Sequence, residues 1–237
     1  MSELNPRYGT KRTTTTPKTA MNLLTLTDTK LAALHRQAMN EIARRTKAVT
    51  NGYDSASIIY SNEMAKRALL VAAAGNHSIL FIGPPNAGKT MLRAVALELG
   101  HGNTFEARPC PCGYRSDPRR ECVCRCNQIE RHVRKLPVVD ICIEVVPPRE
   151  RDMRVGTPGT TVAEMKQQID AKTDYQSLEL DDDSRNLLKA AVSEYALDPD
   201  VRNRIIAVAR TIANLDRSER IDARHLCEAI NYRMFRR

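Results

Sequence analysis

The sequence predicts an α/β fold: a core with a parallel sheet, followed by a small all-helical C-terminal domain. A short apolar run at 79–82 precedes a glycine-rich segment and a helical pattern that ends near Leu99, which is typical of a buried parallel strand and its crossover helix. Two further runs, 104–108 and 138–146, are predicted strands. After residue 160 the apolar residues recur at helical spacing, so helices are expected there.

Caps and breakers mark the helix ends. Thr161-x-x-Glu164 is a capping-box pattern, Asp198 precedes a proline at the first helical position, and Asp222 can cap the last helix. Helices are expected at 28–49, 63–74, 90–99, 161–172, 184–196, 199–215 and from 222 onward, with a helical turn at 129–135. The expected parts are a disordered basic arm (1–20), an N-terminal helix (21–57), a core domain (58–148) with a cysteine-rich insert (108–127), and a helical domain (149–237).

The composition is that of an ordinary soluble protein. The chain contains no apolar run of about eighteen residues, so no transmembrane helix and no membrane partner are expected. The first residues lack the apolar stretch of a secretory signal, and we expect a cytoplasmic protein. In that reducing compartment, seven cysteines favour metal ligands or free thiols over disulfides.

The net charge of +9 is unevenly distributed. Residues 1–50 carry nine Lys/Arg against three Asp/Glu, and residues 108–135 carry eight against three. Clustered positive charge favours a polyanion such as DNA as partner. A solubilising tail with a solvated loop is the alternative, since no base-reading motif accompanies the charge.

Residues 83–90 match the phosphate-loop (Walker A) pattern G-x-x-x-x-G-K-[ST] at every fixed position. In such a loop, backbone N–H groups surround phosphate oxygens and the following helix adds the positive end of its dipole. Lys89 is expected to reach the β- and γ-phosphates, and the Thr90 hydroxyl to ligate Mg²⁺. The expected cofactors are therefore ATP and Mg²⁺. The nucleotide-binding candidates are Gly83, Pro84, Pro85, Asn86, Ala87, Gly88, Lys89, Thr90 and Met91.

The cysteines supply a candidate Zn²⁺ site, because four thiolates can close a tetrahedral zinc centre. The C-x-C spacing is less common than C-x₂-C, and free cysteines on a loop are the alternative. Cys142 and Cys227 lie on apolar patterns and are expected to be packing residues. The candidate ligands are Cys110, Cys112, Cys122 and Cys124, with Cys126 as a possible substitute.

Four segments carry a family resemblance: residues 63–92, RPCPCGYRSDPRRECVC (108–124), VVDICIEVVPP (138–148) and RIIAVARTIANLDRSERIDARHLCEAINYR (204–233). They resemble the AAA+ ATPases related to the magnesium-chelatase I subunit, especially the competence-associated, magnesium-chelatase-like branch. The resemblance implies a P-loop NTPase (AAA+) core with a helical lid. It also implies a homo-oligomeric ring or larger complex that hydrolyses ATP.

The sequence departs from this family where hydrolysis needs an acid. The resemblance implies a Walker B Asp-Glu pair, but the short stretch from Gly100 to Pro109 contains only one acid, Glu106. Asp140 ends the apolar run at 138–139 and could replace the Walker B aspartate. Alternatively, Asp140 is a capped or solvated strand residue. Asp140 and Glu106 are therefore weak catalytic candidates, and the catalytic residues stay undefined.

The arginines and the polar sensor of the family also differ. Arg108 occupies the position of the expected Asn sensor, and 136–138 replace a Leu-Asp-Arg motif that implies an arginine finger. Asp200 occupies the position of the lid arginine, although Arg202 and Arg204 are near it in sequence.

Three functions remain open. The first is an ATP-dependent AAA+ motor acting on DNA, with weak or partner-dependent hydrolysis. The second is a catalytically reduced nucleotide-binding scaffold. The third is a zinc-stabilised nucleic-acid-binding protein whose nucleotide site is vestigial.

Overall fold

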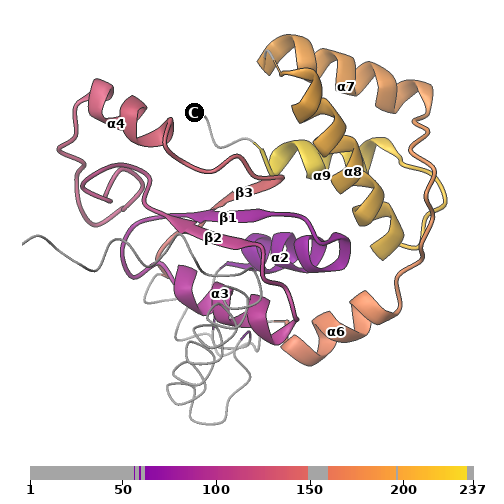
Figure 1. The fold of residues 1–237 in the computed structure, drawn as a ribbon, viewed down its shortest axis with the longest axis horizontal. Helices are drawn as coiled ribbons and strands as arrows, with labels where there is room; N and C mark the ends of the chain where they lie inside the picture. The colour runs from indigo at the N-terminus through magenta and orange to yellow at the C-terminus, as the bar shows by residue number, and fades with distance from the viewer. Residues whose placement is uncertain (1–55, 57–58, 60–61, 149–159, 196, 234–237) are drawn as a thin grey trace, which may run out of the picture. The chain divides into compact units, whose positions relative to one another are not determined.

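The computed structural model describes residues 56, 59, 62–148, 160–195 and 197–233 (Figure 1). The expected arm at 1–20 and the expected helix at 28–49 lie outside these residues.

A three-stranded parallel sheet forms the centre of the core. Strands β1 (Ile79–Ile82), β2 (Thr104–Ala107) and β3 (Ile141–Glu144) have the order β2-β1-β3. The parallel α/β class is thereby confirmed. The strand predicted at 138–146 is shorter than expected, because β1 offers only the four positions Ile79 to Ile82 for pairing with it.

The main core covers one face of the sheet. Ile79 and Phe81 point to this face, where helices α2 (Glu63–Gly75) and α3 (Lys89–Glu98) bury their apolar sides. In Figure 1, both helices lie below the strands, and α3 follows β1 directly through the phosphate loop. The other face carries a smaller cluster around Leu80 and Ile82.

The C-terminal part is helical, as predicted. Helices α6 (Val162–Asp170), α7 (Asp182–Tyr195), α8 (Pro199–Leu215) and α9 (Ala223–Asn231) follow one another. Helices α6 and α8 contact α2, and α9 contacts both α7 and α8. The capping box is formed, with the amide of Glu164 donating to Thr161 Oγ1 at 3.2 Å. None of the helices within the described ranges has the length and apolarity needed to cross a bilayer.

Helix α4 (Cys126–Val133) differs from the expected helical turn at 129–135. It begins earlier because the side-chain oxygen of Gln128 accepts a hydrogen bond from the amide of Arg125 at 3.0 Å, which caps the helix at that point. The cysteine-rich segment before it has no helix or strand between Arg108 and Arg125.

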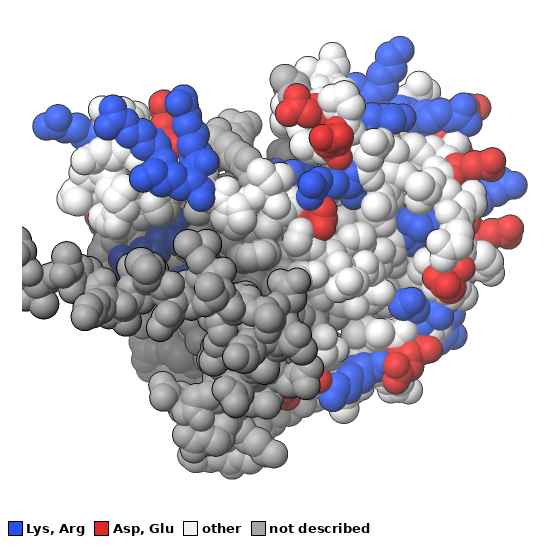
Figure 2. Space-filling model, in the orientation of Figure 1, with Lys and Arg blue, Asp and Glu red and all other residues white. Residues whose placement is uncertain are grey.

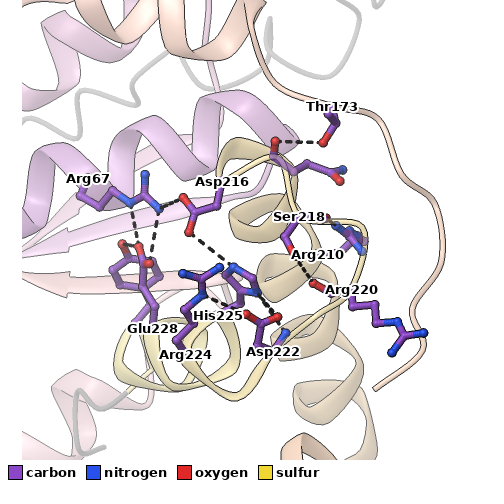
Figure 3. Close-up of polar contacts among 12 residues, drawn as sticks. Arg67, Thr173, Arg210, Asp216, Ser218, Arg220, Asp222, Arg224, His225 and Glu228 are labelled. Atoms are coloured by element: carbon purple, nitrogen blue, oxygen red, sulfur yellow. Dashed lines mark hydrogen bonds and ion pairs between the residues drawn. The ribbon is translucent and has the colours of Figure 1, made fainter. Parts of the chain in front are cut away.

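Polar contacts attach the C-terminal helices to α2 (Figure 3). Arg67 on α2 donates to Glu228 Oε1 on α9 at 2.9 Å and to Asp216 Oδ1 after α8 at 3.3 Å. Asp216 Oδ2 lies 3.4 Å from Nε2 of the buried His225. One guanidinium therefore connects α2 both to the end of α8 and to α9.

Candidate functional site

The phosphate loop joins the carboxyl end of β1 to the start of α3. Gly88 precedes α3 with φ 90°, in the left-handed region where a residue without Cβ is favoured. Asn86 also has a positive φ, 63°. The first amides of α3 lie at the positive end of the helix dipole, where they have no acceptor within the helix, and this is the arrangement that binds anions.

Lys89 lies across this loop. Its ammonium donates to the carbonyl of Gly83 at 2.9 Å and to the carbonyl of Pro84 at 2.7 Å. Burial lowers the pKa of Lys89, and the nearby Glu106 carboxylate opposes this shift. A partly buried cation is thus held against the loop carbonyls at the lining of a cavity, where it can contact a phosphate oxygen.

A cavity of about 320 Å³ opens beside the loop. Its volume is at the lower end of the range of small-ligand sites. The polar residues Asn86, Lys89 and Thr90 of the phosphate loop line it, and Ile59 and Pro148 contribute apolar surface. The cavity is lined by Ile59, Asn62, Asn86, Ala87, Gly88, Lys89, Thr90, Met91 and Pro148.

Six of the nine candidate nucleotide-binding residues, 86 to 91, line this cavity, whereas Gly83, Pro84 and Pro85 do not. Gly83 has a structural role: a Cβ atom there would lie 2.2 Å from the carbonyl oxygen of Val145. Pro85 packs near Gly113 of the cysteine-rich segment.

Sequence reasoning missed Ile59, Asn62 and Pro148. Asn62 donates to the carbonyl of Val146 at 3.1 Å and accepts from its amide at 3.3 Å, which holds the start of α2 against the end of β3. No local pattern identifies these residues, because they come together only when the start of α2 lies against the segment that follows β3. In the sequence, the proline pair at 147–148 indicates only the end of a strand.

The two candidate acids lie at opposite ends of the sheet. Glu106 is near the carboxyl end of β2, and its Oε2 accepts a hydrogen bond from the Thr90 hydroxyl at 3.0 Å. Arg93 Nη1 lies 3.7 Å from Glu106 Oε1. Asp140 precedes β3, at the end of the sheet where Ser78 precedes β1. Glu106 is therefore the acid beside the phosphate loop.

The Asp140 carboxylate accepts three hydrogen bonds. Its Oδ2 accepts from the Ser78 amide at 2.9 Å and the Ser78 hydroxyl at 2.7 Å, and its Oδ1 accepts from Arg204 at 2.8 Å. Burial raises the pKa of Asp140, but these donors lower it more, so that it lies below the usual value. Arg204, which is near the expected lid position in sequence, forms this ion pair and does not line the cavity.

Four of the candidate metal ligands converge. The thiols of Cys110, Cys112, Cys122 and Cys124 all lie within 4.8 Å of one another. The Cys110–Cys112 sulfur distance is 3.3 Å, and each of these sulfurs lies 3.6 Å from that of Cys122. Tetrahedral zinc with Zn–S of about 2.3 Å requires sulfurs about 3.8 Å apart, so this set fits the ion. Cys126 does not belong to the group and is exposed.

The thiols also influence each other's ionisation. A hydrogen bond from the Tyr114 backbone lowers the pKa of Cys112 to about 6. The backbone of Cys124 lowers the pKa of Cys122, but burial and the neighbouring Cys110 and Cys112 outweigh it and raise that pKa to about 12. Ionisation of one thiol thus opposes ionisation of the next, and a divalent cation would remove this penalty.

The remaining two cysteines differ. Cys142 packs against the smaller apolar cluster, as expected. Cys227 is exposed, so the prediction that it packs is wrong, because α9 turns this position away from α8 and the core.

Basic side chains cover the cysteine-rich segment and α4. All eight Lys and Arg of residues 108–135 are exposed, whereas Asp117 is buried and held by Arg119 at 2.9 and 3.0 Å. Figure 2 shows Lys and Arg gathered over α4. We call this set the α4 basic surface: Arg108, Arg115, Arg119, Arg120, Arg125, Arg131, Arg134 and Lys135.

Comparison with known proteins agrees with these features. Residues 55–99 match the family of magnesium chelatase, subunit ChlI, and residues 149–233 match the C-terminal family of the same subunit. The two matches together span more than half of the chain. A segment of 34 residues is 62% identical to competence protein ComM of Haemophilus influenzae, and covers 14% of this chain and 7% of that protein. The chain therefore belongs to the magnesium-chelatase-like AAA+ family.

Proposed function

We propose that this chain binds ATP with Mg²⁺ in the cavity beside residues 83–91 and hydrolyses it slowly, or only when a partner completes the site. One observation carries the proposal: the Lys89 ammonium lies against the carbonyls of the loop, next to a cavity lined by both polar and apolar residues. Such a mixed lining suits a triphosphate and a base.

Each part of the cavity would have its own task. The amides at the start of α3 and Lys89 would hold the phosphates, and Ile59 and Pro148 would contact the base. Mg²⁺, bound with the help of the Thr90 hydroxyl, would neutralise charge that develops on the phosphates.

Slow hydrolysis follows from what surrounds the cavity. Arg204 pairs with Asp140, and no arginine is among the described residues that line the cavity. An arginine finger contributes about 10³–10⁵ in turnover. A neighbouring subunit in a ring is one source of the missing guanidinium, and we propose such a homo-oligomer as the active form.

Affinity for fluorescent ATP and the rate of phosphate release test this proposal. We expect binding with little turnover, loss of binding in Lys89→Ala, and unchanged binding in the control Lys189→Ala, an exposed lysine on α7. Failure of the wild-type protein to bind adenine or guanine nucleotides would refute the proposal. Fast turnover by the monomer would refute the need for a partner.

We also propose that the α4 basic surface binds the phosphate backbone of DNA, with zinc in the cysteine group holding the segment in shape. Only Glu121 and Glu130 are exposed acids within this segment. Arg131→Glu with Arg134→Glu should abolish most of the DNA affinity, whereas Lys189→Glu with Arg202→Glu on α7 and α8 should not. If Lys89→Ala leaves DNA binding unchanged with and without ATP, the nucleotide site is vestigial for this function.

A further inference from the structure

We infer that Glu106 is the acid that holds the metal ion in the nucleotide site. The family resemblance implies a Walker B Asp-Glu pair for this role. The inference rests on the proposed binding of ATP. It departs from the family pattern, because a single glutamate stands where the resemblance implies an Asp-Glu pair. This acid comes from β2, the strand directly beside the phosphate-loop strand.

The strand register brings Glu106 to this position. Glu106 pairs with Phe81 of β1, and side chains of a strand alternate between the two faces of a sheet. Glu106 therefore lies on the same face as Phe81, which is the face covered by α3. It is one residue from the end of β2, and β1 leads from the same edge into the phosphate loop.

The contact with Thr90 orients a ligand for a cation. A hydroxyl has one proton and two lone pairs. The Thr90 proton points to Glu106 Oε2 at 3.0 Å, so the lone pairs are available on the other side of the oxygen. An aspartate at this position would be one methylene shorter, so its carboxylate would end farther from the Thr90 hydroxyl.

The charge of Glu106 and of its neighbours suits a site for Mg²⁺ and a phosphate. Mg²⁺ prefers carboxylate and phosphate oxygens and is held in proteins by one or two carboxylates together with the substrate phosphates. The Glu106 side chain is 21% exposed and does not itself line the cavity, but its hydrogen-bond partner Thr90 does. Arg93 at 3.7 Å and Lys89 on the loop balance its charge before a nucleotide binds.

Metal dependence separates this role from that of an anchor for α3. We would measure the affinity for fluorescent ATP with Mg²⁺ and with chelator, and the binding of Mn²⁺ by electron paramagnetic resonance, in the full chain. In Glu106→Gln, affinity without metal should not fall, because a negative charge near the phosphates is removed, whereas the apparent affinity for Mg²⁺ or Mn²⁺ in the ternary complex should fall about 10–100-fold.

Two further variants sharpen the test. Glu144→Gln is the matched control, because Glu144 is at the same edge of the sheet on β3 but pairs with Ile82 and so lies on the opposite face. It should keep the metal dependence of the wild type. Glu106→Asp retains the charge and should restore part of the metal affinity.

The outcomes are distinct. Glu106→Gln with the metal dependence of the wild type overturns the inference, and so does an equal loss of affinity with and without metal, since a purely structural anchor would act in that way. Failure of the wild type to bind ATP overturns the proposed function and the inference together. If Lys89→Ala abolishes nucleotide binding but Glu106→Gln does not change the metal dependence of binding, the inference is overturned and the proposed function stands.

Discussion

The guanidinium of Arg204 on α8 donates to Oδ1 of Asp140 at 2.8 Å, ahead of β3. Arg204 is one of the two arginines near the expected lid position, and Asp140 is a candidate Walker B acid; they neutralise each other away from the phosphate loop. Arg233, after α9, donates to the carbonyl of Asp140 at 2.9 Å. The C-terminal helices are therefore attached to the sheet at the end where β1 and β3 begin.

Asp140→Asn should lower stability without changing ATP affinity. The variant loses the negative charge that strengthens the hydrogen bonds donated by Ser78 and Arg204, and a bond to a charged group contributes about 1.5–3 kcal/mol against about 0.5–1.5 kcal/mol for a neutral one. Urea unfolding at neutral pH measures the loss, and Glu194→Gln on the exposed side of α7 is the control. A change in nucleotide affinity with unchanged stability would contradict this assignment.

The same residue predicts an acid dependence. The pKa of Asp140 is lower in the folded protein than the value of about 3.9 in the unfolded chain. Its stabilising contribution is therefore complete above that unfolded value and is lost as the pH falls through the folded pKa. The difference in unfolding free energy between the wild type and Asp140→Asn should shrink over this acid range and stay constant near neutrality.

Arg67 and Glu228 should show energetic coupling. The pair joins α2 to α9 at 2.9 Å with both side chains about one-third exposed or less. A double-mutant cycle with Arg67→Gln and Glu228→Gln should give about 0.5–3 kcal/mol. Arg185 and Asp182 form an exposed pair within α7 and should give little coupling. Equal coupling energies in the two cycles would contradict a special role for the α2–α9 contact.

Zinc should bind with a stoichiometry of about one per chain. Cys110 is buried in the thiol group, so Cys110→Ser should remove the metal and lower the melting temperature. Cys126→Ser should retain it, because Cys126 is outside the group. Metal analysis of the purified variants measures this, and retention of zinc in Cys110→Ser would contradict the ligand set.

Gly83→Ala should destabilise the core and weaken nucleotide binding. The added Cβ would lie 2.2 Å from the Val145 carbonyl, so β3 or the loop must shift, at a cost on the order of 1–3 kcal/mol. Gly102→Ala is the matched control, since nothing lies within 4 Å of its Cβ position and its φ is ordinary. Calorimetry of both variants measures the difference, and equal melting temperatures would disagree with this packing.

Local patterns predicted most of the helices and strands because their causes are local. The capping box of Thr161 and Glu164 and the proline after Asp198 act within one helical turn, and the structure has helices at both positions. The start of α4 was missed because the cap comes from Gln128, whose side chain bonds backward to the amide of Arg125. The length of β3 was missed because it depends on β1, its partner in the sheet.

The sequence by itself determined the phosphate loop, the thiol spacing and the order of helices and strands, since these depend on residues that are neighbours in the chain. Only the tertiary structure decided which of the two acids, Glu106 or Asp140, lies beside the phosphate loop. Both are acids beside a short apolar run, and a one-dimensional pattern does not say which end of a parallel sheet an acid occupies. The register of β2 against β1 places Glu106 beside Thr90, and pairing with Ser78 and Arg204 places Asp140 at the other end.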